Sequence, residues 1–366
     1  MHSGYCTQNN RNAHCATRRR EAALDSRVGH SGYGRRAAVS DVPKETQAVY
    51  AALDLGTNNC RLLVATPSPD GFKVIDSFSR ITRLGEGLHA SGMLSDLAIE
   101  RTISALRVCS NKVRRHRRLR ARFVATEACR GASNCSRFVE EVAYETGIAL
   151  EIITAREEAQ LAARGCGPLL VPERRYALIF DIGGGSTEVT WLKVADDGTT
   201  GEPIDSMSMP WGVVRLAEEY GSGEKDPEMF EVMVATIRDL LQWFERRHNI
   251  SGHLRDGRVQ MIGTSGTVTT IAGAHLNLER YQRDKVDGRL MQFDQIRAIV
   301  DRFATMTLDD LAAHPCIGPE RADLVLPGCA IMEAILREWP VGRLRVADRG
   351  LREGILFNLI AADRAV

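Results

Sequence analysis

Two stretches of the chain share one pattern of apolar and polar positions. Each has an apolar run, a polar turn that opens with aspartate and glycine, and a second apolar run. The first is VYAALDLGTNNCRLLVA, residues 49–65, and the second is YALIFDIGGGSTEVT, residues 176–190. Each predicts a buried strand, a tight turn and another strand. Because internal repetition indicates duplicated structure, we interpret Asp54 and Asp181 as equivalent positions in two related halves.

The remaining periodicity predicts strands that alternate with helices. Further strands are expected at 72–81, 122–126, 150–153, 203–209, 258–262 and 344–346, and helices at 94–114, 154–165, from 210, and at 228–248, 293–304, 321–337 and 351–360. This alternation is typical of α/β proteins. We expect a first domain at 47–172 and a second at 173–366, with the last helix a candidate to cross back onto the first domain.

Residues 1–46 differ from the rest of the chain. They are polar, rich in arginine and poor in large aliphatic side chains, so they bury too little to offset the entropy of ordering. We expect a disordered extension. An arm that binds nucleic acid and a mis-assigned start are the alternatives, and nucleic acid is not an expected partner.

Composition narrows the class of protein. The 366 residues include 48 basic and 47 acidic side chains, so any attraction for a polyanion must be local. The nine cysteines are scattered, odd in number and without a C-x-x-C pair, which fits a reducing cytoplasm better than a disulfide or zinc framework. No apolar run has membrane-spanning length, and there is neither a G-x-x-x-x-G-K-[ST] nor a G-x-G-x-x-G motif.

The two glycine turns are the candidate chemistry. A turn without Cβ atoms lets backbone N–H groups approach an anion such as phosphate. Asp181 and Glu188 flank one turn and Asp54 opens the other, and carboxylates bind a hard cation such as Mg²⁺. A third turn, GTSGTVTT, follows an expected strand and opens a helix, where free N–H groups favour an anion. For any single turn taken alone, the alternative interpretation is an ordinary hairpin that binds no anion.

These motifs resemble those of a known family. DLGTNNCRLLVA, ATEACRGASN, IITAREEAQL, DIGGGSTEVT, GTSGTVTT and LREGIL occur in family order from about Val49 to the C-terminus. They are similar to the motifs of the exopolyphosphatase and guanosine pentaphosphate phosphohydrolase (Ppx/GppA) family, in its short two-domain form. The resemblance implies two duplicated ribonuclease-H-like domains of the actin, sugar-kinase and heat-shock-chaperone superfamily, with a cleft between them. It also implies a homodimer.

The resemblance assigns roles to particular residues. Glu158 is expected to activate the attacking water, and Arg130 to act beside it as a phosphate clamp. Mg²⁺ or another divalent cation is expected near Asp54, Asp181 and Glu188. The expected phosphate-binding residues are Gly56, Thr57, Asn58, Arg61, Gly183, Gly184, Gly185, Ser186, Thr187, Gly263, Ser265 and Gly266.

Two glutamates at the start of one predicted helix have different expected roles. Thr154 and Glu157 have the spacing of a capping box, in which Thr154 is the N-cap and Glu157 lies at N3. Glu158 is then left free near the start of the helix. Without the family motif, the alternative for Glu158 is a solvated acid stabilised by the helix dipole.

The resulting hypothesis is a cytoplasmic phosphoric anhydride hydrolase. It would remove the terminal phosphate of inorganic polyphosphate, and the alternative substrate is guanosine pentaphosphate. A kinase of the same superfamily, a non-catalytic sensor of polyphosphate or of guanosine penta- or tetraphosphate, and a structural protein are the other possibilities. The basic run RRHRRLRAR, residues 114–122, is either a solvated helix end or a track for the polymer.

Overall fold

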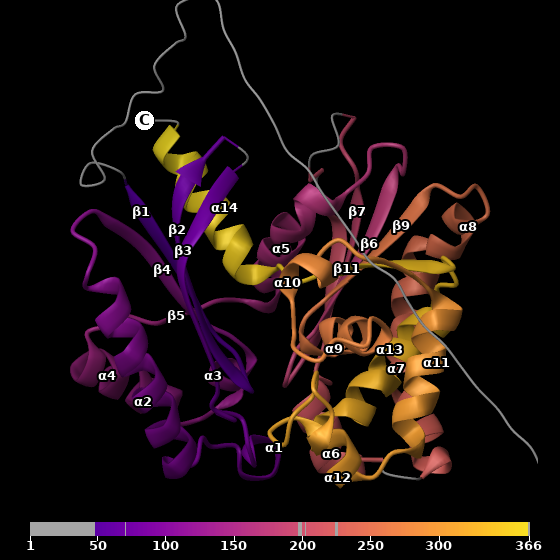
Figure 1. The fold of residues 1–366 in the computed structure, drawn as a ribbon, viewed down its shortest axis with the longest axis horizontal. Coiled ribbons are helices and arrows are strands. Elements are labelled where there is room, and N and C mark those ends of the chain that lie inside the picture. The colour runs from indigo at the N-terminus through magenta and orange to yellow at the C-terminus, as the bar shows by residue number, and fades with distance from the viewer. Residues whose placement is uncertain (1–47, 70, 197–199, 202, 224–225, 365–366) are drawn as a thin grey trace, which may run out of the picture. The chain divides into compact units, whose positions relative to one another are not determined.

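Two mixed β-sheets form the framework of the protein (Figure 1). The computed structural model describes residues 48–364, apart from 70, 197–199, 202 and 224–225. All of these lie in one compact unit, Pro43–Val366. The extension expected at 1–46 lies outside the described residues. Within the described part of the chain, no helix is both long and apolar enough to cross a membrane.

The first sheet has five strands in the order β3-β2-β1-β4-β5. β1 pairs with β2 in antiparallel and with β4 in parallel orientation, and β2 pairs with β3 in antiparallel orientation. The strands are β1 (Val49–Leu55), β2 (Asn59–Ser68), β3 (Gly71–Ile81), β4 (Leu119–Ala125) and β5 (Glu151–Ile152).

The second sheet repeats this plan. Its order is β10-β11-β9-β6-β7-β8, in which β6 pairs with β7 in antiparallel and with β9 in parallel orientation. The strands are β6 (Tyr176–Ile182), β7 (Thr187–Lys193), β8 (Pro203–Met209), β9 (Val259–Thr264), β10 (Leu290–Gln292) and β11 (Arg343–Ala347). Apart from β10, order and direction match the first sheet strand for strand. The predicted α/β fold with two duplicated halves is therefore confirmed.

Helices cover both sheets. Those of the first half of the chain are α1 (Leu88–Ser91), α2 (Asp96–Val113), α3 (Glu127–Gly131), α4 (Cys135–Thr146), α5 (Ala155–Cys166) and the 3₁₀ turn η1 (Gly167–Leu169). Those of the second are α6 (Val213–Tyr220), α7 (Pro227–His248), α8 (Ile250–Leu254), α9 (Gly266–His275), α10 (Arg283–Val286), α11 (Phe293–Thr305), α12 (Leu308–Ala313), η2 (Ala322–Leu324), α13 (Val325–Glu338) and α14 (Leu351–Arg364).

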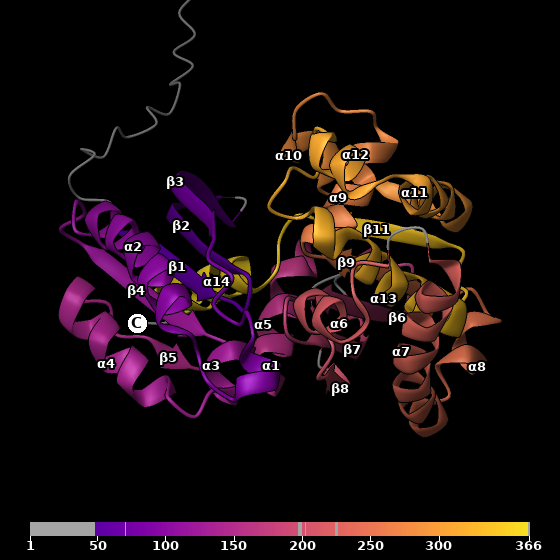
Figure 2. The same cartoon turned by 90° about the horizontal axis from the view of Figure 1, so that it is seen from below.

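Two helices cover the inner faces of the sheets and pack on each other (Figures 1 and 2). α14, from the C-terminal end of the chain, shares a buried cluster with β1 and β2, in which Ile355 and Leu356 meet Ala52 and Leu63. α5 packs on the second sheet, where Ala163 and Cys166 join a cluster with β6 and β9. We call the first sheet with α1–α4 and α14 the first lobe, and the second sheet with α5–α13 the second lobe.

Strand alternation places the two aspartates on these inner faces. Successive strand residues point to opposite faces of a sheet. Ala52 lies in the cluster with α14, so Asp54 at the end of β1 points to the same side. Likewise Ile179 lies in the cluster with α5, and Asp181 follows it on that side. The duplicated fold thus directs both carboxylates to the space between the lobes.

Candidate active site

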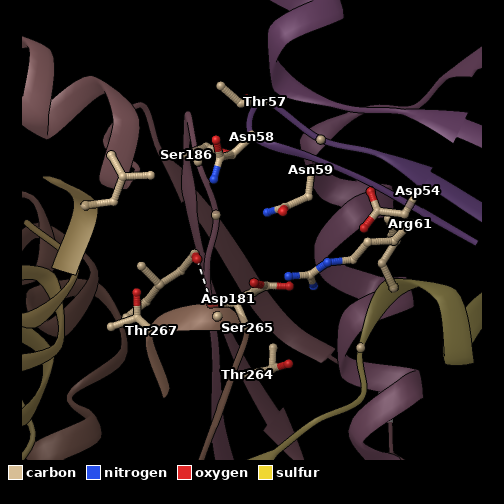
Figure 3. Close-up of a pocket in the computed structure, with 18 of the residues that line it drawn as sticks. Asp54, Thr57, Asn58, Asn59, Arg61, Asp181, Ser186, Thr264, Ser265 and Thr267 are labelled. Carbon is tan, nitrogen blue, oxygen red and sulfur yellow. Dashed lines mark hydrogen bonds between the residues drawn. The ribbon is translucent and has the colours of Figure 1, made fainter. Parts of the chain in front are cut away.

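A pocket lies where the two Asp-turn hairpins face each other (Figure 3). Its wall combines the turn after β1, the glycine turn after β6, the first turn of α9 and the segment 348–353. Of the residues expected from the sequence, those that line it are Asp54, Gly56, Thr57, Asn58, Arg61, Glu158, Asp181, Gly183, Gly184, Gly185, Ser186, Ser265 and Gly266. Hairpins more than a hundred residues apart in sequence therefore build one site.

Asp54 and Asp181 are partly buried carboxylates in an acidic surrounding. Burial raises the pKa of Asp181 to about 7, and the nearby charges of Glu188 and Asp54 raise it as well. Burial also raises the pKa of Asp54. Neither carboxylate forms a hydrogen bond or an ion pair within 4 Å with any residue that the structure describes. Two unpaired carboxylates in one pocket indicate that the site is built for a cationic or proton-donating ligand.

Arginine supplies the opposing charge. Figure 3 shows Arg61 reaching across the pocket toward Asp181, beside Asp54. A second guanidinium group lines the same pocket, that of Arg352 in the first turn of α14. Both arginines act to lower the pKa of Asp54 and of Asp181, against the effect of burial. The pocket therefore holds both signs of charge close together.

The glycine turn after β6 meets the first hairpin across the pocket. A Cβ on Gly184 would lie 3.0 Å from Thr57 Cβ and 3.1 Å from the Asn58 nitrogen, and one on Gly185 would overlap the carboxylate of Glu127. Thr57 also donates to Glu127 at 3.0 Å. The absence of side chains in this turn therefore lets the lobes meet, in addition to exposing backbone donors.

Two amide side chains in the first turn have unused acceptors. The Oδ1 atoms of Asn58 and Asn59 are buried without a hydrogen-bond partner. Buried polar atoms are normally paired, so an unpaired one at a pocket wall calls for an explanation. A ligand or its bound water would supply the missing partner.

The third turn presents the start of α9 to the pocket. Ser265, Gly266 and Thr267 line it, and the first amides of a helix have no partner within the helix. Ser265 has φ 89°, a strained conformation for a residue with a side chain. Its hydroxyl donates to the Ile182 carbonyl at 2.6 Å, which ties this turn to the glycine turn. Gly263 lies outside the pocket, inside β9, where a Cβ would overlap the Phe180 ring.

Glu158 lines the pocket, but it is not free as the sequence suggested. Arg130 donates to its Oε2 at 2.8 Å and to the Ile153 carbonyl at 3.0 Å. Burial and the charge of Glu188 raise the pKa of Glu158 well above its usual value, while Arg130 acts to lower it. Arg130 itself is not part of the pocket lining. In this geometry its guanidinium group holds Glu158, and its role as a phosphate clamp stays a prediction.

The capping arrangement before Glu158 is half of what the sequence predicted. Thr154 caps α5 and accepts from the Glu157 amide at 3.2 Å. The Glu157 carboxylate, however, pairs with Arg122 on the neighbouring strand β4 instead of returning to the cap. A full ionic partner outcompetes a backbone amide for a carboxylate.

Glu188 and Thr187 lie behind the glycine turn. Ser186 and Ser208 donate to the Glu188 carboxylate at 2.6 and 2.8 Å, and the Thr187 hydroxyl donates to the Trp211 carbonyl at 2.7 Å. Neither residue lines the pocket. Their side chains are thus committed to internal hydrogen bonds.

The site can be tested for its fit to Mg²⁺. In the described residues, no three His, Cys, Asp or Glu side chains gather closely enough to hold a metal ion directly. The metal role of Asp54, Asp181 and Glu188 stays a prediction. Mg²⁺ commonly keeps several waters and uses only one or two carboxylates. The unpaired carboxylates of Asp54 and Asp181 and the unpaired Asn59 oxygen fit such a hydrated ion.

The basic run at 114–122 lies at the far end of the first sheet. Leu119 pairs with Val49 at the start of β1, whereas Ala125 pairs with Leu55 beside the pocket. Several of its arginines are also engaged: Arg114 donates to the Thr146 carbonyl, Arg120 pairs with Asp363 and Arg122 with Glu151. This arrangement favours the solvated helix end over a track that leads to the site.

Several pocket residues were missed in the sequence. Glu127 and Arg352 stand inside motifs that had been noticed for their order but given no role. Asn59, Thr264 and Thr267 also stand inside the quoted motifs without a role. The fold alone brings in Arg321, Asp348 and Arg349. The available signal for Arg352 was its place in the LREGIL motif, in the first turn of the C-terminal helix.

Comparison with known proteins identifies the family. The model of the Ppx/GppA phosphatase family matches residues 63–362. Exopolyphosphatase 2 of Mycobacterium tuberculosis is 29% identical over 326 residues, covering 84% of this chain and 98% of its own. The crystal structure of the Aquifex aeolicus family member has a TM-score of 0.70 at 27% identity, covering 86% of this chain and 98% of its own.

Two further solved structures share the fold. An exopolyphosphatase-like protein has a TM-score of 0.74 at 27% identity, with 86% of this chain and 98% of its own covered. An exopolyphosphatase from Cytophaga hutchinsonii shares the fold, with a TM-score of 0.77 at 23% identity and the same coverage. The match of the family model over most of the chain, together with the two facing Asp-turn hairpins, shows that the chain belongs to the Ppx/GppA phosphatase family.

Proposed function

We propose that the protein is an exopolyphosphatase, which hydrolyses the terminal phosphate of inorganic polyphosphate. The observation that carries this is the position of Glu158, whose carboxylate lines the same pocket as all three anion-binding turns. The names of the Mycobacterium tuberculosis and Cytophaga hutchinsonii relatives support it. Phosphoryl transfer to water requires an acid–base group and a phosphate cradle, and Glu158 and the three turns would fill these roles.

The residues would divide the work as follows. Backbone N–H groups of the turns at Gly56, Gly183–Gly185 and the start of α9 would bind phosphate oxygens, and Arg61 would add a fixed positive charge. Glu158 would orient a water in line with the terminal phosphorus and accept its proton. Its raised pKa suits a base that works near neutral pH, because a base of ordinary carboxylate pKa drives proton abstraction less.

Mg²⁺ is part of the proposal. Asp54 and Asp181 would hold it, with waters completing its shell. When bound, it would neutralise charge on the phosphate oxygens. Its removal by a chelator is expected to suppress phosphate release and to leave the fold intact.

The deciding experiment measures phosphate release from long-chain polyphosphate and from guanosine pentaphosphate, with Mg²⁺ and with chelator. Glu158→Gln should lower turnover by roughly 10²–10⁴-fold, the usual contribution of a general base. Glu157→Gln is the matched control, because Glu157 is adjacent in sequence but outside the pocket lining and paired with Arg122. Near-normal turnover in Glu158→Gln would contradict the assignment. No release from either substrate by the unmodified protein would favour a sensor, and consumption of nucleotide only with an added acceptor would favour a kinase.

A second candidate function is the 5′-phosphohydrolysis of guanosine pentaphosphate. The pocket extends beyond the phosphate turns into an apolar recess of the second lobe, lined by Ile271, Phe303, Leu324, Val325 and Cys329. An inorganic chain has no apolar part to place there, whereas a nucleoside has one. Release from guanosine pentaphosphate with little release from polyphosphate would select this candidate.

Location and assembly complete the proposal. The seven cysteines in the described part of the chain are buried free thiols, which fits a reducing compartment such as the cytoplasm. We propose a homodimer on the family resemblance alone. Light scattering of the purified protein would test it.

A further inference from the structure

The first turn of α14 brings one arginine into the pocket without a partner. Arg352 lines the pocket, and it makes no hydrogen bond and no ion pair within 4 Å with any residue that the structure describes. Arg61, on the inner face of the first sheet, lines the same pocket and is equally without such a partner in the described chain. Arg321 lines the pocket as well, so Arg61 and Arg352 are two of three guanidinium groups at its wall that have no such partner in the described chain.

The charged neighbours of Arg352 are all used to hold the segment in place. Arg283 donates to Glu353 at 2.9 Å, and Tyr281 donates to Asp348 at 2.6 Å. Arg349 pairs with Asp287, and Glu353 accepts from the Gly350 amide at 2.9 Å. These contacts tie the start of α14 to the second lobe. Arg352 is the charged side chain of the segment 348–353 that takes part in none of these contacts.

The position of Arg352 is electrostatically unfavourable in the absence of a ligand. Burial lowers the pKa of its guanidinium group, and the positive charge of Arg61 lowers it further, while Glu353 and Asp54 oppose this. Like charges that are drawn together and removed from water cost free energy unless an anion binds both. Planar guanidinium groups match phosphate oxygens in a bidentate manner, as an ammonium group does not.

We propose that Arg352 is a second phosphate-binding residue, which acts with Arg61 to hold the phosphate chain of the substrate behind its terminal group. This rests on the proposed function, because it assigns a contact to the same substrate class. The ligand recognised is a chain of at least two phosphates, since two separate guanidinium groups face it. Arg352 thus binds substrate and takes no part in proton transfer.

Enzyme assays give the first test. Arg352→Gln should raise the KM for polyphosphate about tenfold or more, because hydrogen bonds between charged groups are lost, with a smaller change in kcat. The KM of Arg352→Lys should lie between that of the unmodified protein and that of Arg352→Gln. Millimolar guanidinium should restore part of the lost kcat/KM in Arg352→Gln. It should not do so in the control Arg164→Ala, which removes an exposed arginine of α5 outside the pocket.

A binding experiment separates this proposal from the proposed function. Calorimetry with pyrophosphate needs no turnover, and we expect Arg352→Gln to bind it about tenfold more weakly than the unmodified protein. An unchanged pyrophosphate affinity and an unchanged KM in a variant with the unmodified melting temperature would overturn the role of Arg352. The unmodified protein could bind pyrophosphate in an Arg352-dependent manner and yet hydrolyse neither polyphosphate nor guanosine pentaphosphate. In that case the proposed function is wrong and the phosphate-binding role of Arg352 is supported. Should Arg352→Gln not fold, Arg352→Lys decides, and an unchanged KM there would reject the proposal.

Discussion

Arg130 and Glu158 act as a unit at the scale of single residues. The sequence placed both near the chemistry but assigned Arg130 to the phosphate and left Glu158 free. The structure pairs them at 2.8 Å, with the Arg130 side chain 22% and the Glu158 side chain 15% exposed. A partly buried carboxylate needs a counter-charge to remain ionised. Arg130 therefore sets the protonation of Glu158 in the proposed mechanism.

Replacing Arg130 should move the pH dependence of the reaction. The positive charge of Arg130 lowers the pKa of Glu158, so Arg130→Gln should raise that pKa further. The proposed base must be deprotonated, and the acidic limb of the pH profile of kcat/KM should shift to higher pH. Arg137→Gln, an exposed change on α4, is the control. An acidic limb that stays in place in Arg130→Gln would show that this charge does not act on the base.

The crossing of α5 and α14 is the decisive contact at the scale of elements. A Cβ on Gly354 of α14 would overlap the Leu161 carbonyl, and one on Gly165 of α5 would overlap the Gly350 carbonyl. Each helix covers the inner face of one sheet, so a close crossing draws both sheets together. Backbones approach this closely only where side chains are absent.

Gly354→Ala should therefore destabilise the protein although alanine is the better helix former. Overpacking against backbone, which cannot swing aside, typically costs about 1–3 kcal/mol. Gly131→Ala in α3 is the matched control, because its Cβ would approach other atoms no closer than 3.6 Å. Urea unfolding of both variants at constant m-value would measure the difference. If the unfolding free energy of Gly354→Ala equals or exceeds that of the control, the crossing of α5 and α14 accommodates the added methyl group without loss of stability.

Contacts around the pocket connect the two lobes at the scale of the whole molecule. Arg83, held at φ 47°, pairs with Asp323 at 3.0 Å and donates to the Glu320 carbonyl at 3.1 Å. The Gly87 amide donates to Glu218 at 2.8 Å. These contacts join the segment after β3 to the second lobe. They stabilise the arrangement in which the two hairpins face each other.

Exchanging the charges of one pair tests whether this contact supports activity. Asp323→Arg places like charges together, and kcat/KM should fall by up to about fivefold, because partly exposed pairs contribute about 0.2–1 kcal/mol. The exchanged pair Arg83→Asp with Asp323→Arg should regain most of the loss. Added salt should shrink the effect, since it screens surface charges. Equal losses in the single and double variants would mean that the ion pair itself does not matter.

The local pattern was sufficient for the framework. Apolar runs bounded by aspartate and glycine predicted both hairpins, and their repetition predicted the duplicated α/β fold, because strand formation and tight turns depend mainly on neighbouring residues. The same pattern identified Asp54 and Asp181, and the family resemblance added Arg61 and Glu158. All four line the pocket.

Tertiary structure alone decided which side chains of the site remain free to contact a ligand. Pairing of Arg130 with Glu158, and of Ser208 with Glu188, depends on distances between residues from different elements. Arg352 reaches the pocket only because α14 returns to the first sheet from the end of the chain. Such contacts have no local signature, since they arise from how the sheets and their crossing helices pack. The sequence thus determined the hairpins and their chemistry, and packing determined which of those groups face the ligand.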